Sequence, residues 1–140
     1  MSDLLLDTHI ALWLNNGDVR LGKAAQQTIE ATWKAGGRIL LSAVSVWEIA
    51  MLVDKGAIEL DLPVDGWVER FLSRPGLEAV SLHHRAAALA YNLHHLEHRD
   101  PADRLLIASA IDAGCPLVTH DERIRRFART RGRQYRFSIA

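Results

Sequence analysis

Four acidic residues of this sequence stand where apolar runs end or helical patterns begin: Asp7, Glu48, Asp103 and Asp121. Carboxylates gathered at one site repel, since two unit charges ~4 Å apart interact by ~4 kcal/mol at an effective dielectric of ~20. A shared site must therefore bind protons or a cation. All-oxygen ligands suit Mg²⁺ or Mn²⁺ rather than Zn²⁺. Because such cations support phosphodiester hydrolysis, this is the chemistry that the acids predict if they converge.

Two of the acids follow expected strands. Asp7 comes directly after the apolar run 4–6, and Asp121 comes two residues after the run 116–119. An acid that abuts a buried strand gains nothing from burial and requires a partner. In a parallel sheet the carboxyl ends of the strands meet at one edge, where sites gather. We therefore expect the four acids to face one cleft if the sheet is parallel.

Helix capping is an alternative role for several acidic positions. Ser45 and Glu48 have the spacing of a capping box, and so have Thr119 and Glu122. The Asp100-Pro101 pair is typical of an N-cap followed by a first-turn proline. Acids also favour the first helical turn through the helix dipole. Spacing alone leaves capping and metal binding both open.

The elements that must position these residues alternate along the chain. Short apolar or weakly alternating runs predict strands at 4–6, 39–41, 78–82 and 116–119, with a further edge strand at 135–139. Helical spacing predicts helices at 10–14, 23–34, 45–54, 67–72, 84–96, 101–113 and 122–130. Gly114 is the expected C-terminal stop of the helix that begins after Asp100. This alternation favours an α/β fold, with a mainly parallel sheet covered by helices on both faces.

Length and composition fit one domain over residues 1–140. The chain is 49% hydrophobic, and its 17 basic and 17 acidic residues leave no net charge, so bulk charge predicts neither a nucleic-acid nor a membrane partner. The charge is unevenly distributed, however. Residues 121–140 hold 7 Arg and 2 acids, against 10 basic and 15 acidic residues in 1–120. The basic end is the region from which a polyanion contact is expected.

Cysteine content and hydropathy suggest a reducing compartment without a membrane span. Cys115 is the single cysteine, which excludes an intramolecular disulfide framework and a multi-cysteine zinc site. No apolar run nears the ~18 residues that a span needs, and Asp3 and Asp7 interrupt the start of the chain. We expect a cytoplasmic protein with no membrane partner.

Four stretches in this order resemble the PIN domain and, within it, the VapC-like toxins of type II toxin–antitoxin pairs: LLLDTHIALWL, LSAVSVWEIAMLVDKG, HRDPADRLLIASAI and PLVTHDERI. The resemblance implies a three-layer α/β/α sandwich and an Mg²⁺- or Mn²⁺-dependent endoribonuclease. It further implies an RNA substrate, a VapB-like antitoxin as partner and a homodimer.

The resemblance also assigns roles residue by residue. The family's four catalytic, metal-binding acids fall on Asp7, Glu48, Asp103 and Asp121. Asp100 is a further acid of the same stretch, and Thr119 matches the hydroxyl that often accompanies the last acid. Ala102 stands where many relatives have a bulky residue, which affects local packing or a partner contact and not the acids.

Other residues have supporting roles or open ones. His9 and His120 flank two of the acids and are expected to line the cleft or orient groups there, with proton transfer as the alternative. The arginines expected to contact RNA are Arg123, Arg125, Arg126 and Arg129, and an acidic antitoxin segment is the competing partner. The four tryptophans are expected in the core or an interface. His94 and His98 have the spacing of a helical metal pair, but a solvated helix face is favoured.

Two other functions remain open from the sequence. A catalytically inactive PIN-like module that binds RNA or protein would agree with the capping explanations of the acids. A hydrolase of the same kind could instead act on DNA or on small nucleotides.

Overall fold

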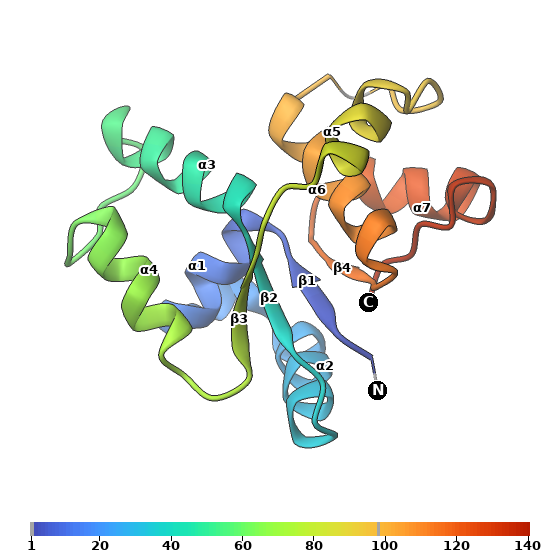
Figure 1. Ribbon diagram of the computed structural model, residues 1–140. Coiled ribbons are helices and arrows are strands. Elements are labelled where there is room, and N and C mark those ends of the chain that lie inside the picture. The colour runs from blue at the N-terminus through green and yellow to red at the C-terminus, as the bar shows by residue number, and fades with distance from the viewer. Residues whose placement is uncertain (1, 98) are drawn as a thin grey trace.

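Four parallel strands form the central sheet, in the order β3-β2-β1-β4 (Figure 1). The computed structural model describes residues 2–97 and 99–140. The strands are β1 (Leu4–Leu6), β2 (Ile39–Ser42), β3 (Leu77–Val80) and β4 (Leu117–Val118). Leu5 of β1 is in register with Leu40 on one side and with Leu117 on the other. The predicted parallel sheet is confirmed.

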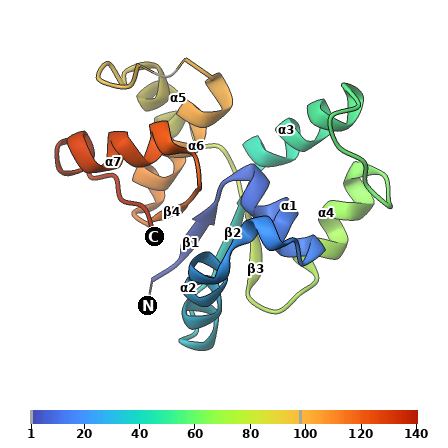
Figure 2. The same cartoon turned by 180° about the vertical axis from the view of Figure 1, so that it is seen from behind.

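Helices cover both faces of this sheet (Figures 1 and 2). They are α1 (Thr8–Asn16), the 3₁₀ turn η1 (Val19–Leu21), α2 (Lys23–Lys34), α3 (Ala43–Asp54), α4 (Val64–Leu72), α5 (His84–Tyr91), α6 (Pro101–Ala113) and α7 (Glu122–Tyr135). Buried residues of α1, α2 and α4 form a core on one face, and those of α6 and α7 form a core on the other. The predicted three-layer α/β/α sandwich is confirmed.

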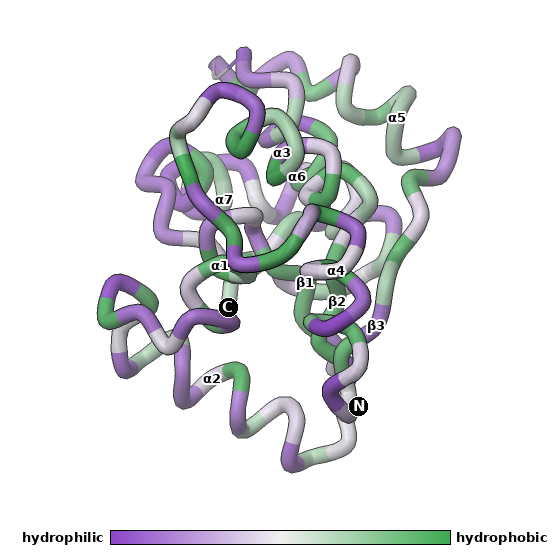
Figure 3. Tube along the Cα trace, turned by 90° about the vertical axis from the view of Figure 1, so that its left-hand side faces the viewer, coloured by the Kyte–Doolittle hydropathy of each residue, from purple (hydrophilic) through white to green (hydrophobic). Residues whose placement is uncertain are grey.

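The side-chain alternation of β1 explains the two cores. Leu4 and Leu6 pack with the α1, α2 and α4 core, whereas Leu5 packs with α6 and α7. All three leucines are almost completely buried. This explains the continuous apolar run, which is expected for a strand covered on both faces. Figure 3 shows the hydrophobic β1 and β2 at the centre, whereas α2 alternates along its length between hydrophobic and hydrophilic residues.

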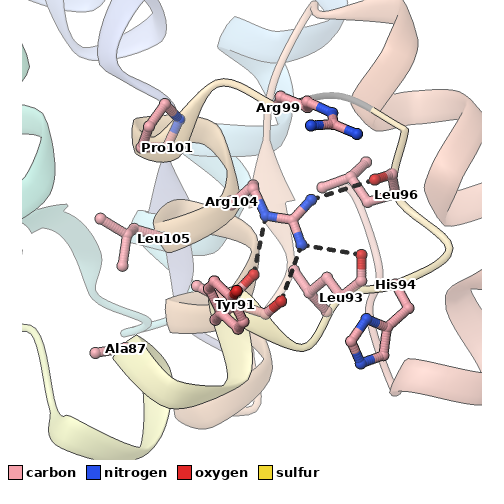
Figure 4. A pocket seen from close by; sticks show the side chains of 10 residues that line it. Ala87, Tyr91, Leu93, His94, Leu96, Arg99, Pro101, Arg104 and Leu105 are labelled. Atoms are coloured by element: carbon pink, nitrogen blue, oxygen red, sulfur yellow. Dashed lines mark hydrogen bonds between the residues drawn. The ribbon is translucent and has the colours of Figure 1, made fainter.

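The helix predicted over 84–96 is wrong at its C-terminal end. Helix α5 stops at Tyr91, and the backbone then turns. Arg104 of α6 donates to the carbonyl oxygens of Ala90, Leu93 and Leu96 over 3.0–3.2 Å (Figure 4). These carbonyls therefore have a tertiary partner in place of a further helical turn. The helical pairing of His94 with His98 fails with the helix, and His98 lies outside the described residues.

The C-terminal prediction also needs correction. Helix α7 continues to Tyr135, beyond the predicted end at 130, and Arg136 ends it in a left-handed conformation with φ 56°. The predicted edge strand 135–139 is reduced to one parallel bridge between Ile139 and Leu117. Among the described residues, no helix is both long and apolar enough to cross a bilayer.

Candidate active site

A cleft of about 420 Å³ collects the acids at the carboxyl end of the sheet. Its walls are built from the segments that follow β1, β2 and β4 and from the start of α6. The residues that line it are Asp7, His9, Ile10, Trp13, Glu48, Asp100, Asp103, His120, Asp121 and Arg123. All four acids predicted to converge lie here, although they come from four separate parts of the chain.

Asp7 links β1 to α1 and is held at both carboxylate oxygens. Oδ1 accepts a 2.8 Å hydrogen bond from the backbone N–H of Thr8, so Asp7 is the N-cap of α1. Oδ2 accepts a 2.6 Å bond from the hydroxyl of Thr119, which follows β4. Asp7 is 9% exposed. Its carboxylate is therefore fixed in orientation by groups from two neighbouring strands.

Glu48 is available to the cleft because it does not cap its helix. The N-cap of α3 is Ser42, whose Oγ accepts from the N–H of Val44, so the predicted Ser45–Glu48 capping box is wrong. The helix begins directly after β2, which places Ser45 inside it. The Ser45 hydroxyl instead accepts a 3.0 Å bond from Oγ1 of Thr8. The buried Glu48 then lies in the second turn of α3 and lines the cleft.

Asp100 and Asp103 come from the start of α6. The predicted N-cap is confirmed: Oδ1 of Asp100 accepts a 2.9 Å bond from the N–H of Ala102, and Pro101 follows. Asp103 is buried in the first turn. One carboxylate oxygen each from Glu48, Asp100 and Asp103 lie within 4.8 Å of one another. Asp100 thus combines the capping role with a place in the acidic cluster.

Asp121 caps α7 in a way that the sequence did not predict. Its Oδ1 accepts from the backbone N–H groups of Arg123 at 2.8 Å and Ile124 at 3.3 Å. The predicted Thr119–Glu122 capping box is therefore wrong. The Thr119 hydroxyl accepts from the N–H of Asp121 at 3.1 Å while it donates to Asp7. Thr119 joins the two strand-end acids through one side chain.

The electrostatics of the cleft favour a cation. Burial raises the pKa of Asp7, against the lowering effect of its hydrogen bonds and with a further increase from the charge of Asp121. Burial also raises the pKa of Glu48, and the charges of Asp7 and Asp100 add to the effect. Both carboxylates are thus destabilised in their ionised form by the protein alone. A divalent cation at the oxygen cluster would remove this conflict, and an all-oxygen set fits a hard ion such as Mg²⁺ or Mn²⁺.

Most of the chain matches a known protein family. The family model of the PIN domain matches residues 4–130. The chain belongs to the PIN domain family. The match spans every strand of the sheet and all five acids of the cleft.

This PIN domain has a relative among curated proteins, and its fold has counterparts among solved structures. It is 36% identical over 125 residues to Ribonuclease VapC22 of Mycobacterium tuberculosis (strain ATCC 25618 / H37Rv), covering 89% of this chain and 92% of that protein. VapBC2 from Rickettsia felis bound to a promoter DNA fragment contains a chain with a TM-score of 0.65, at 20% identity, over 88% of this chain and 91% of that one. DNA-bound VapBC from Salmonella typhimurium also gives a TM-score of 0.65 at 20% identity, over 100% and 98%. At these identities the solved structures support the fold.

An aromatic wall closes one side of the cleft of the PIN domain. The ring centroid of Trp13 lies 5.7 Å from that of His9 and 6.0 Å from that of His120. Nε2 of His120 lies 2.6 Å from the carbonyl oxygen of Leu21, so this nitrogen carries a proton and donates. Both histidines line the cleft, as expected. Trp13 was not expected in the site, although its position four residues after His9 places the two on one face of α1.

The four arginines of the PIN domain predicted to contact RNA have different environments. Arg123 lines the cleft and approaches Oδ2 of Asp121 to 3.8 Å. Arg125 donates to the backbone carbonyl of Thr119 at 3.2 Å, and Arg129 pairs with Glu122 at 2.6 Å. Arg126 is exposed and lines a neighbouring groove, described below.

Proposed function

We propose that this PIN domain is a metal-dependent endoribonuclease, the toxin of a type II toxin–antitoxin pair, which hydrolyses phosphodiester bonds of RNA. The observation that carries the proposal is the oxygen cluster of Glu48, Asp100 and Asp103 in a cleft that Asp7 and Asp121 also line. The similarity to Ribonuclease VapC22 of Mycobacterium tuberculosis supports the same activity.

Glu48, Asp100 and Asp103 are the residues that would hold Mg²⁺ or Mn²⁺, and Asp7 and Asp121 line the same cleft. When bound, such an ion polarises the phosphoryl group and lowers the pKa of water. Asp100 uses Oδ1 to cap α6, so its Oδ2 is the oxygen left for a ligand. The predicted four-residue set would then be extended by Asp100.

The remaining residues of the cleft have roles that follow from their chemistry. Asp7, held by Thr8 and Thr119, presents a fixed acceptor to which an attacking water can donate a proton. The oxygen of that water forms a bond to phosphorus while the bond to the leaving ester oxygen breaks, and this oxygen departs with the bonding electron pair and takes a proton from solvent. Arg123, which lines the cleft, supplies positive charge to the phosphate.

The test is cleavage of RNA by variants that keep the shape of the acids. We expect Asp103→Asn and Asp7→Asn to abolish cleavage and growth inhibition, because each removes a negative charge from the cleft while preserving its size. Asp54→Asn, on an exposed acid at the end of α3, is the matched control and should cleave normally. Full activity of Asp103→Asn, or undiminished cleavage in excess chelator, contradicts the proposal. The same assay with a DNA substrate tests the alternative of deoxyribonuclease activity.

The partner in this proposal is a VapB-like antitoxin, and the site of action is the cytoplasm, where RNA is accessible. Two solved structures with this fold are complexes named VapBC, from Rickettsia felis and Salmonella typhimurium. Co-expression with the product of a short neighbouring reading frame should suppress growth inhibition. That product should also co-purify with this chain. Continued inhibition with every such product would argue against the pairing.

A homodimer completes the proposal. Trp47 on α3 is 62% exposed, whereas Trp67 on α4 is 1% exposed and belongs to the core. Tryptophan is enriched at protein interfaces, where its large apolar ring is covered by the partner. Trp47 is therefore our candidate contact between two copies of the chain.

A further inference from the structure

A second groove opens beside the acidic cleft. It has a volume of about 340 Å³ and lies between the 95–97 segment and α7. The residues that line it are His95, Leu96, Glu97, Arg123, Arg126, Phe127, Thr130 and Arg131. Arg123 lines both the groove and the cleft. The two depressions thus share one lining residue.

The charge on the groove is carried by one face of α7. Arg123, Arg126 and Arg131 line it, against a single acid, Glu97. Arg126 and Arg131 are exposed, and within the described residues neither forms an ion pair. Arg129 lies outside the groove and is paired with Glu122. Two of the unpaired arginines of α7, Arg126 and Arg131, therefore place positive charge along the groove.

The opposite wall of the groove is held in place by the helix that carries the acids. The carbonyl of Leu96 accepts a 3.2 Å bond from Arg104, the residue that follows Asp103 on α6 (Figure 4). Nδ1 of His95 lies 2.5 Å from the hydroxyl of Tyr135 on α7. Phe127, which is 3% exposed, also lines the groove. The wall is thus tied both to the acidic cleft and to the arginine helix.

We propose that this groove binds the phosphate backbone of single-stranded RNA next to the phosphodiester cleaved in the acidic cleft. The inference rests on the proposed ribonuclease function and adds the path of the substrate. A strand whose scissile phosphate lies among the carboxylates passes Arg123 and then meets Arg126 and Arg131. Phosphate contacts of this kind position a strand without reading its sequence. Because Arg123 lines both the cleft and the groove, one RNA strand can contact both, which favours RNA over an acidic peptide as the occupant.

The experiment measures RNA binding in a form that does not depend on cleavage. Asp103→Asn is the common background, and a fluorescent single-stranded RNA is titrated by anisotropy over a range of salt concentrations. Adding Arg126→Ala with Arg131→Ala should weaken binding about tenfold. It should also reduce the slope of log affinity against log salt by about 1.4, since each phosphate contact on a single strand contributes about 0.7.

Controls separate the groove from bulk charge and from misfolding. Lys34→Ala with Arg133→Ala removes two exposed positive charges that do not line the groove, and should leave the slope unchanged. Arg126→Lys with Arg131→Lys keeps the charge and should retain most of the slope even if the alanine pair proves unstable.

Two outcomes would overturn the groove proposal. Equal loss with both alanine pairs would mean a diffuse electrostatic effect. Unchanged RNA binding by the Arg126 and Arg131 alanine pair, together with loss of antitoxin binding, would assign the groove to an acidic peptide. Failure of the unsubstituted chain to cleave RNA would refute the proposed function, whereas the binding result would still report on the groove.

Discussion

The hydroxyl of Thr119 donates a 2.6 Å hydrogen bond to Oδ2 of Asp7, across 112 positions of the chain. The hydroxyl oxygen of Thr119 also accepts a hydrogen bond from the N–H of Asp121. One small buried side chain, 2% exposed, therefore fixes the geometry of two cleft acids that come from neighbouring parallel strands.

Replacing this hydroxyl tests the relationship. Thr119→Val keeps the shape but leaves Oδ2 of Asp7 and the N–H of Asp121 without their partner, at a cost of about 1–3 kcal/mol in the free energy of unfolding. We expect RNA cleavage to fall by about 10–100-fold, as for groups that orient metal ligands. Thr119→Ser restores the hydroxyl and should recover most of the activity. Urea unfolding and cleavage rates provide the two measurements, and an unaltered rate in Thr119→Val would contradict the role.

Burial of Asp7 predicts a specific dependence of stability on pH. Because burial raises the pKa of Asp7, the metal-free folded state holds the proton more tightly than the unfolded chain does. The contribution of this group to stability is therefore present below its ordinary pKa of about 3.9 and is lost as the pH rises through its folded value. At neutral pH its negative charge destabilises the fold.

Asp7→Asn removes this charge and should raise the melting temperature of the metal-free protein at pH 7. A gain of about 1 kcal/mol corresponds to roughly 4 °C at this chain length. The advantage over the unsubstituted protein should shrink toward pH 4. Glu30→Gln, on an exposed acid of α2, is the control and should change little. A melting temperature that falls equally at both pH values would show that the hydrogen bonds of Asp7 outweigh its charge.

The exposure of Trp47 predicts an effect on assembly. If two copies of the chain meet at α3, Trp47→Lys should convert a dimer into a species near the 15.7 kDa of one chain. Light scattering after size exclusion measures this mass. Val19→Lys alters another exposed apolar residue, in η1, and should leave the dimer intact. A single-chain mass for the unsubstituted protein at micromolar concentration would refute the homodimer.

The contact between Gly76 and Trp33 predicts a stability effect far from the cleft. Gly76 has φ 82°, and an added Cβ would lie 2.4 Å from Cδ1 of Trp33, whose Nε1 donates to the carbonyl of Pro75 at 2.8 Å. We expect Gly76→Ala to lower the free energy of unfolding by about 2–3 kcal/mol, through backbone strain and overpacking together.

Gly56→Ala separates the two causes of that loss. Gly56 has φ 72°, but an added Cβ there would have no heavy atom within 4 Å beyond its chain neighbours. Its loss should be limited to the strain, about 1 kcal/mol. Urea titrations of both variants give the comparison, and equal losses would mean that the ring contact contributes nothing.

Local interactions made much of the fold readable from the sequence. The continuous apolar run 4–6 indicated a strand buried on both faces. Asp100 followed by Pro101 marked the start of α6, and Gly114 marked its end. The acids that follow strands were assigned to one cleft because parallel strands present their carboxyl ends at a common edge. These inferences depend on neighbours in sequence or on a general property of parallel sheets.

Helix boundaries and caps were less predictable, since several side chains in a short stretch have compatible chemistry. Ser42 caps α3 although Ser45 has the better sequence pattern, because the strand before the helix ends at Ser42. Helix α5 stops early because the guanidinium group of Arg104 on α6 binds the carbonyl of Ala90 in its last turn and those of Leu93 and Leu96 beyond it. No pattern within either segment contains this information.

By itself, the sequence determined the α/β architecture, the ends of α6 and the acids that line the cleft, because periodicity and strand-end positions are local properties. Only the tertiary structure decided that Asp100 joins Glu48 and Asp103 within one oxygen cluster, that Thr119 orients Asp7, and which arginines of α7 face the groove. These relationships depend on how separate helices pack across the sheet. Packing sets distances between residues that are far apart along the chain, and such distances leave no periodic trace in the sequence.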